Sequence, residues 1–214
     1  MDIDVDHRVT TIEQLGELYR PPAERAAAKV FSVIDEVSSR FIEYVSFAVL
    51  STSDGSLSSD ASPRGGPPGF IQQLDDRHVA IPDLVGNNRL DSFRNILANP
   101  IAGLLLVVPG NEETLRINGP AALTVDPDIL DRFTGQLRRP KLAIVIETAE
   151  LYGHCAKAFR RGGVWSPDFW STLSDAPDLA EIYSCQFADV DERSIRSTVQ
   201  EIYRRDLRSD GAET

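Results

Sequence analysis

The chain has 214 residues, of which 42% are hydrophobic, and its formal net charge is −11 at pH 7. This hydrophobic content is enough for a folded core and excludes a largely disordered chain. The acidity disfavours nucleic acid and anionic membranes as partners, because like charges repel one another. Short arginine-rich stretches in so acidic a chain need a specific explanation, and a phosphate ligand would provide one.

The cysteines and histidines argue against a metal site and against a disulfide scaffold. Cys155 and Cys185 show no metal-ligand spacing, and the three histidines lie far apart in the sequence. We expect Cys155 to be buried. The N-terminal residues are acidic and lack the apolar stretch of a signal peptide, and no apolar run is long enough to span a bilayer. The expectation is a cytoplasmic protein.

The first segment, residues 1–40, is predicted to be an N-terminal helical extension. Thr11 is placed to cap a short helix that runs to Leu18 and ends before Pro21-Pro22. A second helix is predicted to begin at Pro22, because apolar residues recur at helical spacing as far as Val37.

The second segment, residues 41–165, is predicted to be a small antiparallel barrel, because short strands and turns alternate in it at close intervals. Strands are expected over 47–52, 57–62, 70–74, 78–81, 101–108, 114–125 and 141–151, with helices over 91–98 and 126–133. Helices over 155–161, 167–173, 176–185 and 192–208 are expected to follow. The fold class is therefore mainly β with flanking helices, and residues 166–214 are expected to pack on the barrel as part of one domain.

The first candidate binding element is the loop Ser62-Pro63-Arg64-Gly65-Gly66 at the end of a predicted strand. Glycines allow close approach of a ligand to backbone N–H groups, and an arginine fork matches the geometry of a phosphate. An ordinary solvated loop with one arginine is the alternative.

The second candidate element is Gly86-Asn87-Asn88-Arg89, which leads directly into the helix predicted from Asp91. Asn and Gly tolerate positive φ, and a helix N-terminus favours a bound anion. Arg89 can pair with a phosphate, and Ser92 can donate its hydroxyl. The alternative is a plain helix start capped by Asn88 or Asp91.

Both elements flank the short strand pair predicted between Phe70 and Ile81, so we expect them to converge in space. Two arginines, several N–H groups and a helix start in one place indicate a site for a phosphomonoester. The neighbouring apolar strands would supply a slot for a flat ring.

The order of these motifs resembles the pyridoxamine 5′-phosphate oxidase-like flavoprotein family. The resemblance extends over most of the chain, from about residue 41 to 165. The motifs that carry it are Ser62-Pro63-Arg64-Gly65-Gly66-Pro67-Pro68-Gly69-Phe70, Ile81-Pro82-Asp83, Gly86-Asn87-Asn88-Arg89 with Asp91-Ser92 and Asn95-Ile96, Asn99-Pro100, Val108-Pro109-Gly110, Glu113-Thr114-Leu115-Arg116, Asn118-Gly119, and His154-Cys155-Ala156-Lys157-Ala158 followed by Trp165.

The resemblance implies an FMN-binding split β-barrel, a six-stranded antiparallel Greek-key barrel, and a homodimer with FMN at the interface. It implies that Asn88 and Arg89 bind the phosphate, that Ile81-Pro82 lies beside the ribityl chain, and that the strand of Arg116 reaches the ring. The expected cofactor-binding residues are Ser62, Arg64, Gly65, Ile81, Pro82, Asn87, Asn88, Arg89, Ser92, Arg116 and Trp165.

Two departures from the family pattern argue against pyridoxamine phosphate as substrate. The oxidase of that name has a lysine five residues after its arginine, and Gly69 stands at that place here. Its C-terminal arginine-leucine-x-proline motif is also absent from this sequence. Both elements serve the substrate rather than FMN, so FMN binding is still expected.

The third candidate element is a basic segment in which His154, Lys157 and Arg161 are spaced to share a helix face. A positive group near the flavin would stabilise its reduced form, so His154 and Lys157 are the candidate catalytic residues. The alternative is a structural helix end with Trp165 in the core.

The sequence therefore predicts an FMN-dependent oxidoreductase that acts on a small molecule, with NAD(P)H as a candidate electron donor. The alternatives are a flavin-binding storage or sensor protein without turnover, and a split-barrel relative that uses a deazaflavin or haem.

Overall fold

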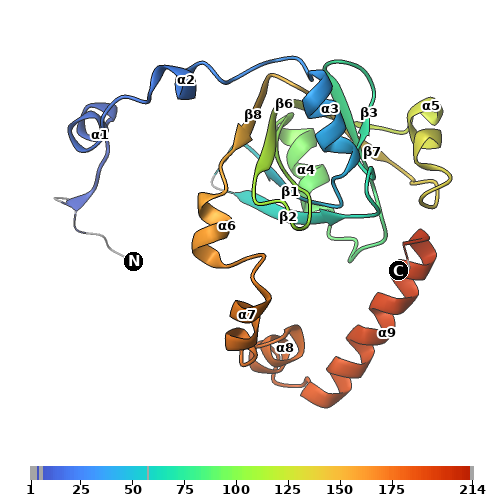
Figure 1. Cartoon of the computed structure of the whole chain (residues 1–214). Coiled ribbons are helices and arrows are strands. Elements are labelled where there is room, and N and C mark those ends of the chain that lie inside the picture. Colours follow the sequence, from blue (N-terminus) through green and yellow to red (C-terminus); the bar gives the residue numbers. More distant parts are fainter. Residues whose placement is uncertain (1–3, 5–6, 57, 213–214) are drawn as a thin grey trace. The chain divides into compact units, whose positions relative to one another are not determined.

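The computed structural model describes residues 4, 7–56 and 58–212 (Figure 1). The chain divides into two units, Met1–Val30 and Phe31–Thr214. The division lies at Val30, ten residues earlier than the boundary expected from the sequence. It lies there because the residues that follow, including the buried Ile34, belong to the core of the second unit.

The first unit contains two short helices, α1 (Ile12–Leu18) and α2 (Glu24–Ala27). The predicted cap of α1 is confirmed, since Thr11 and Gln14 form a reciprocal capping box. The prediction of a helix continuing toward Val37 is wrong. Phe31 instead exchanges two backbone hydrogen bonds with Leu151, and this strand-like pairing is incompatible with helical backbone.

The second unit is built on an antiparallel sheet with the strand order β2-β1-β5-β6-β7-β4-β3, and β8 pairs with β6 beside this path. The two ends of this order, β2 and β3, do not pair with each other in the described part of the chain, so the sheet is an open split barrel. The expected fold class, mainly β with flanking helices, is confirmed. The strands are β1 (Phe47–Ser53), β2 (Ser59–Gly65), β3 (Gln72–Gln73), β4 (His78–Pro82), β5 (Ile101–Val107), β6 (Thr114–Thr124), β7 (Ala143–Glu147) and β8 (Glu150–His154).

The predicted long strand over 141–151 is two strands, because the chain bulges between β7 and β8. Both pair with β6, but three residues, 147–149, oppose only Gly119 and Pro120. The backbones come so close there that a Cβ at Gly119 would overlap the carbonyl oxygen of Glu147. Gly119 is therefore required by the bulge.

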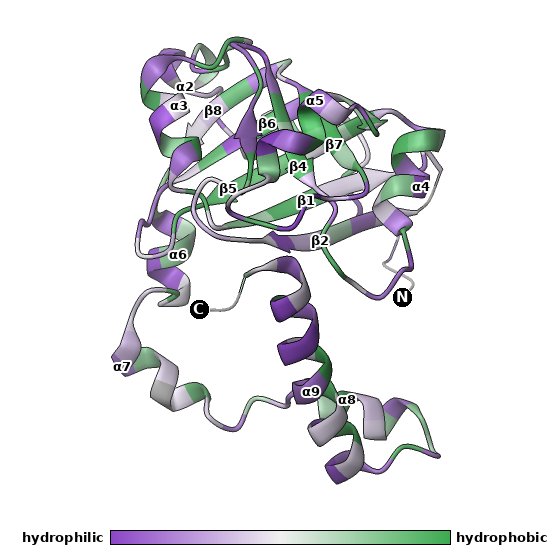
Figure 2. Ribbon diagram, turned by 90° about the vertical axis from the view of Figure 1, so that its right-hand side faces the viewer, coloured by the Kyte–Doolittle hydropathy of each residue, from purple (hydrophilic) through white to green (hydrophobic). Residues whose placement is uncertain are grey.

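Alternating residues of the strands form the hydrophobic core. Leu50, Leu104, Ile117 and Ile144 are all buried, and strands β5 and β7 are largely hydrophobic in Figure 2. Helix α4 (Asp91–Ala98) packs against β1 and β6, and the Asn95 side-chain amide donates to the Thr52 hydroxyl at 3.1 Å. Packing α4 here places its N-terminus next to β2.

The remaining helices are short except for the last. Helix α9 (Glu192–Asp210) is mostly hydrophilic (Figure 2) and packs against α8 (Leu179–Gln186). Arg196 of α9 pairs with Glu192 of the same helix and with Asp178 at the start of α8. Within the described residues, no helix is both long and apolar enough to cross a membrane. The remaining helices of the second unit are α3 (Glu36–Glu43), α5 (Pro127–Leu130), η2 (Asp131–Phe133), α6 (Lys157–Gly162), α7 (Pro167–Trp170), η3 (Ser171–Leu173), α8 (Leu179–Gln186) and α9 (Glu192–Asp210).

Candidate functional site

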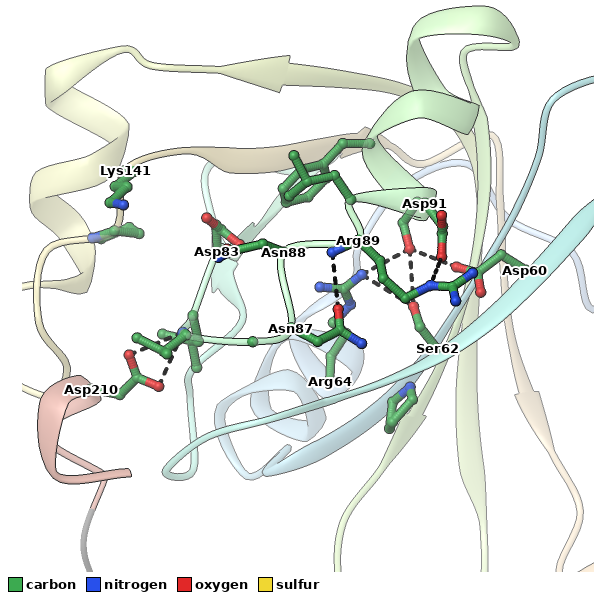
Figure 3. A pocket seen from close by; sticks show the side chains of 18 of the residues that line it. Asp60, Ser62, Arg64, Asp83, Asn87, Asn88, Arg89, Asp91, Lys141 and Asp210 are labelled. Atoms are coloured by element: carbon green, nitrogen blue, oxygen red, sulfur yellow. Dashed lines mark hydrogen bonds and ion pairs between the residues drawn. The ribbon is translucent and has the colours of Figure 1, made fainter. Parts of the chain in front are cut away.

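The two arginine loops predicted from the sequence line one cavity of about 570 Å³ (Figure 3). Strand β2 and the loop before α4 form one wall, and the loop before β7 and the end of α9 form the other. Six of the expected cofactor-binding residues line it: Ser62, Arg64, Asn87, Asn88, Arg89 and Ser92.

Strand β2 directs three polar side chains to the cavity, because residues two apart share a face of a strand. Asp60, Ser62 and Arg64 are the half-buried positions of this strand, and the residues between them are exposed. This alternation was visible in the sequence, but the sequence analysis did not include Asp60 in the site.

Arg64 is held by the hydroxyl groups of Ser62 on β2 and Ser92 at the start of α4. Its Nη2 donates to Ser62 Oγ at 3.1 Å and to Ser92 Oγ at 2.9 Å, and Ser92 Oγ donates to Asp60 Oδ2 at 2.7 Å. Its Nε is buried and has no hydrogen-bond partner among the described residues. A buried donor without a partner is costly, so an acceptor that reached this nitrogen, such as a phosphate oxygen, would stabilise the site.

Burial also lowers the pKa of Arg64, an effect that nearby Asp83 and Asp60 partly offset. A guanidinium remains protonated at neutral pH even when its pKa falls, so Arg64 is a desolvated cation. A desolvated cation attracts an anion more strongly than an exposed one does.

The loop from Asp83 to Leu90 turns sharply before α4. Asn88 and Leu90 adopt positive φ values of 56° and 60°, a conformation that is strained for leucine. The Arg89 amide donates to Asn87 Oδ1 at 3.0 Å. Leu90 is the N-cap and makes no side-chain cap hydrogen bond, so the predicted alternative of an Asn88 or Asp91 cap is wrong. The N-terminus of α4 is left open beside the cavity, where it favours an anion.

Arg89 lies at the rim, with 73% of its side chain exposed. Its Nε donates to Asp91 Oδ2 at 2.7 Å, and this hydrogen bond raises the pKa of Arg89. An incoming phosphate must therefore compete with Asp91 for the Nε of Arg89, whereas the Nε of Arg64 has no competing acceptor among the described residues.

The cavity also holds charged residues that the sequence analysis missed. Asp83 follows β4, Lys141 precedes β7, and Asp210 ends α9 (Figure 3). Burial raises the pKa of Asp83, and Asp210 adds to that rise while Arg64 and Lys141 oppose it. Asp83 appeared in the sequence only as part of a family motif, and no local pattern indicated that residues near position 210 return to the barrel.

Replacing Asp83 by asparagine is expected to raise the free energy of unfolding at pH 7. The pKa of Asp83 is higher in the folded chain than its ordinary value of 3.8. Protonated Asp83 therefore stabilises the folded state below pH 3.8, and this stabilisation is lost as the pH rises through the folded pKa. The gain in the variant should therefore shrink as pH falls toward 3.8. Denaturant unfolding at several pH values measures it.

Asp54→Asn is the matched control, because hydrogen bonds to Ser56 lower the pKa of Asp54. A lowered pKa favours folding above 3.8 and the contribution is lost on acidification, so this variant should be less stable at pH 7. A lower stability of Asp83→Asn at pH 7 would contradict the sign assigned to Asp83.

Several expected site residues do not line this cavity. Gly65 is exposed at the end of β2, and Ile81 and Pro82 are buried on β4. Arg116 stacks over the Tyr152 ring, with 5.0 Å from its guanidinium carbon to the ring centroid. Trp165 donates from Nε1 to the carbonyl of Asn111 at 2.8 Å. Gly65 is next to Arg64 in β2, but Arg116 and Trp165 are not among the residues that line the cavity with Arg64.

The basic segment is also arranged differently from the prediction. His154 is the last residue of β8 and α6 begins at Lys157, so His154, Lys157 and Arg161 do not share one helix face. The pairing of β8 with β6 extends to His154 and keeps its backbone extended. Cys155 is exposed rather than buried, because it lies in the connection between β8 and α6.

The fold defines a split-barrel protein, and its cavity is lined by both basic and acidic side chains. A family model described as pyridoxamine 5′-phosphate oxidase matches residues 34–155, which is more than half of the chain. The chain belongs to this family. No curated protein sequence matches it.

Solved structures with a similar fold include HupZ from Group A Streptococcus (17% identity, 56% of this chain and 93% of that chain, TM-score 0.45). A second is a putative pyridoxamine 5′-phosphate oxidase from Lactobacillus delbrueckii (12% identity, 58% and 98%, TM-score 0.45). A third is the FAD binding protein from Mycobacterium smegmatis (12% identity, 58% and 97%, TM-score 0.40). Similarities of this size carry no argument about the ligand of this chain.

Proposed function

We propose that this protein binds FMN and holds the flavin phosphate in the cavity between β2 and the N-terminus of α4. The observation that carries the proposal is the buried Nε of Arg64, which lacks a partner among the described residues. Arg64 lines the same cavity as the uncapped start of α4. A phosphomonoester would accept hydrogen bonds from Arg64 and from the amides at the start of α4. Membership of this family supports a flavin as the molecule that carries the phosphate.

The cofactor would supply the redox chemistry, and the chain would supply its position and the surrounding charge. We further propose an oxidoreductase of the pyridoxamine 5′-phosphate oxidase-related type that acts on a small molecule and takes electrons from NAD(P)H. Pyridoxamine phosphate itself is not the proposed substrate, because Gly69 replaces the substrate-binding lysine.

The expected ring contacts from Arg116 and Trp165 lie outside the phosphate cavity of one chain. A homodimer with FMN at the interface would allow one copy to bind the phosphate and the other to contribute to the ring site. The proposed dimer rests on the family resemblance and is tested by the mass of the purified protein in solution.

Replacing Arg89 by alanine is expected to weaken FMN binding by about 1.5 kcal/mol, roughly tenfold, which is the low end for a charged hydrogen bond. The low end applies because Asp91 competes for Arg89. Titration of the FMN-free protein, followed by quenching of flavin fluorescence, measures the change.

Arg94→Ala is the matched control, because Arg94 is an exposed arginine on α4 that does not line the cavity. An Arg89→Ala variant with the affinity of the Arg94→Ala variant would reject the placement of the phosphate at Arg89. Turnover with reduced nicotinamide and an acceptor separates an enzyme from a storage or sensor protein.

A further inference from the structure

The end of α9 reaches the cavity, although this helix lies more than a hundred residues beyond the anion-binding loop in the sequence. Asp210, its last residue, is only 6% exposed and lines the cavity. Its two carboxylate oxygens each accept from the Val85 amide at 3.2 Å (Figure 3). A buried carboxylate with a backbone donor fixes the position of that donor.

The same turn of α9 also holds the opposite wall of the cavity. The carbonyl oxygen of Asp210 accepts from the Arg138 amide at 2.9 Å, and Arg138 Nη1 donates to Ser209 Oγ at 3.1 Å. Gly211 ends the helix with φ of 74°, which lets Ala212 turn back and pack on the hydrophobic core. Residues 209–212 therefore join the loop before α4 to the loop before β7.

Val85 immediately precedes the anion-binding segment Gly86-Asn87-Asn88-Arg89. Asn88 and Leu90 adopt positive φ to direct this segment into α4, and this conformation is strained at Leu90. Strained loops persist only where surrounding contacts hold them. The Asp210–Val85 hydrogen bonds supply such a contact at the start of the loop.

We propose that Asp210 is a positioning residue for the cofactor site, and that the C-terminal turn of α9 is a clamp that holds the anion-binding loop. This inference rests on the proposed function, because it assigns the loop to FMN phosphate. It makes cofactor affinity depend on the C-terminal helix, a part of the chain outside the segment matched by the family model.

Position and charge at Asp210 have opposite effects on an anion. The carboxylate holds the loop in place, but its negative charge, beside that of Asp83, opposes a phosphate. Burial raises the pKa of Asp210, an effect that the Val85 amide and the charge of Arg138 oppose and that Asp206 reinforces. Asparagine at 210 keeps an acceptor oxygen for Val85 and removes the charge, so it separates the two effects.

The experiment compares the FMN affinity of Asp210→Ala and Asp210→Asn with that of the unaltered chain. We expect the alanine variant to bind FMN about tenfold more weakly and the asparagine variant to bind at least as tightly as the unaltered chain. Glu201→Ala, an exposed acidic position on α9, is the control and should change nothing. A folded asparagine variant with weakened binding, or an alanine variant with unchanged binding, would overturn the proposal.

Hydrogen exchange of the Val85 amide in the FMN-free protein provides a second measurement that does not depend on the cofactor. We expect faster exchange in Asp210→Ala than in the unaltered chain, and little change in Asp210→Asn. Equal exchange in all three proteins would reject the clamp. If the unaltered chain took up no FMN, the proposed function would fail, and the exchange rates would still decide whether Asp210 holds the loop.

Discussion

Replacing Arg64 by alanine is expected to weaken FMN binding by about 2–3 kcal/mol, roughly 30- to 160-fold, the range for a buried charged hydrogen bond. The effect should exceed that of Arg89→Ala, because Arg64 is desolvated and its Nε has no partner among the described residues, whereas Arg89 is exposed and paired. Fluorescence titration of the FMN-free variant gives the dissociation constant. Asp60 loses a nearby cation in this variant. Thermal unfolding shows whether that loss also lowers the stability of the fold.

Two further variants define what Arg64 contributes. Arg64→Lys keeps the charge but lacks the planar fork of guanidinium donors, so its affinity should fall between those of the unaltered chain and the alanine variant. Arg40→Ala removes an exposed arginine of α3 that does not line the cavity, and it should bind FMN normally. A folded Arg64→Ala variant that binds FMN as tightly as Arg40→Ala would show that the phosphate lies elsewhere.

Replacing Gly119 by alanine is expected to lower the free energy of unfolding by about 3 kcal/mol, the upper range for a forced steric overlap in a packed region. The added Cβ would overlap the carbonyl oxygen of Glu147 and lie 2.9 Å from the Ala149 amide nitrogen. Both are backbone atoms of the bulge, and backbone cannot move aside as a flexible side chain can. Denaturant unfolding measures the loss.

Gly153→Ala is the matched control in the same sheet. Gly153 lies on β8, and a Cβ there would meet nothing within 4 Å. Its stability should remain close to that of the unaltered chain. Similar losses for the two variants would mean that the bulge does not impose glycine at position 119.

The elements that the sequence predicted well are those whose signals are local. Helix α4 runs from Asp91 to Ala98 as predicted, since Asn99-Pro100 ends it. Strands β1, β5 and β6 were placed within one or two residues of their observed ends, because apolar β-rich runs and turn residues define them. The break between β7 and β8 was missed, because the bulge depends on the partner strand β6.

The part of the candidate site that was predicted from the sequence is the part whose residues lie close together in the chain. Arg64 and Arg89 do line one cavity, as their positions around β3 and β4 indicated. The contribution of Asp210 could not be predicted, because nothing in the sequence around α9 specifies where a helix end docks. The Asp91 partner of Arg89 was also missed, since Asp91 was considered only as a cap residue.

The most direct test of the central claim compares FMN with riboflavin, which carries the same ring without the phosphate. If the cavity holds the phosphate, the FMN-free protein should bind FMN at least tenfold more tightly than riboflavin. The Arg64→Ala variant should lose most of this preference. Equal affinities for FMN and riboflavin in the unaltered chain would contradict the phosphate site, whatever the fold.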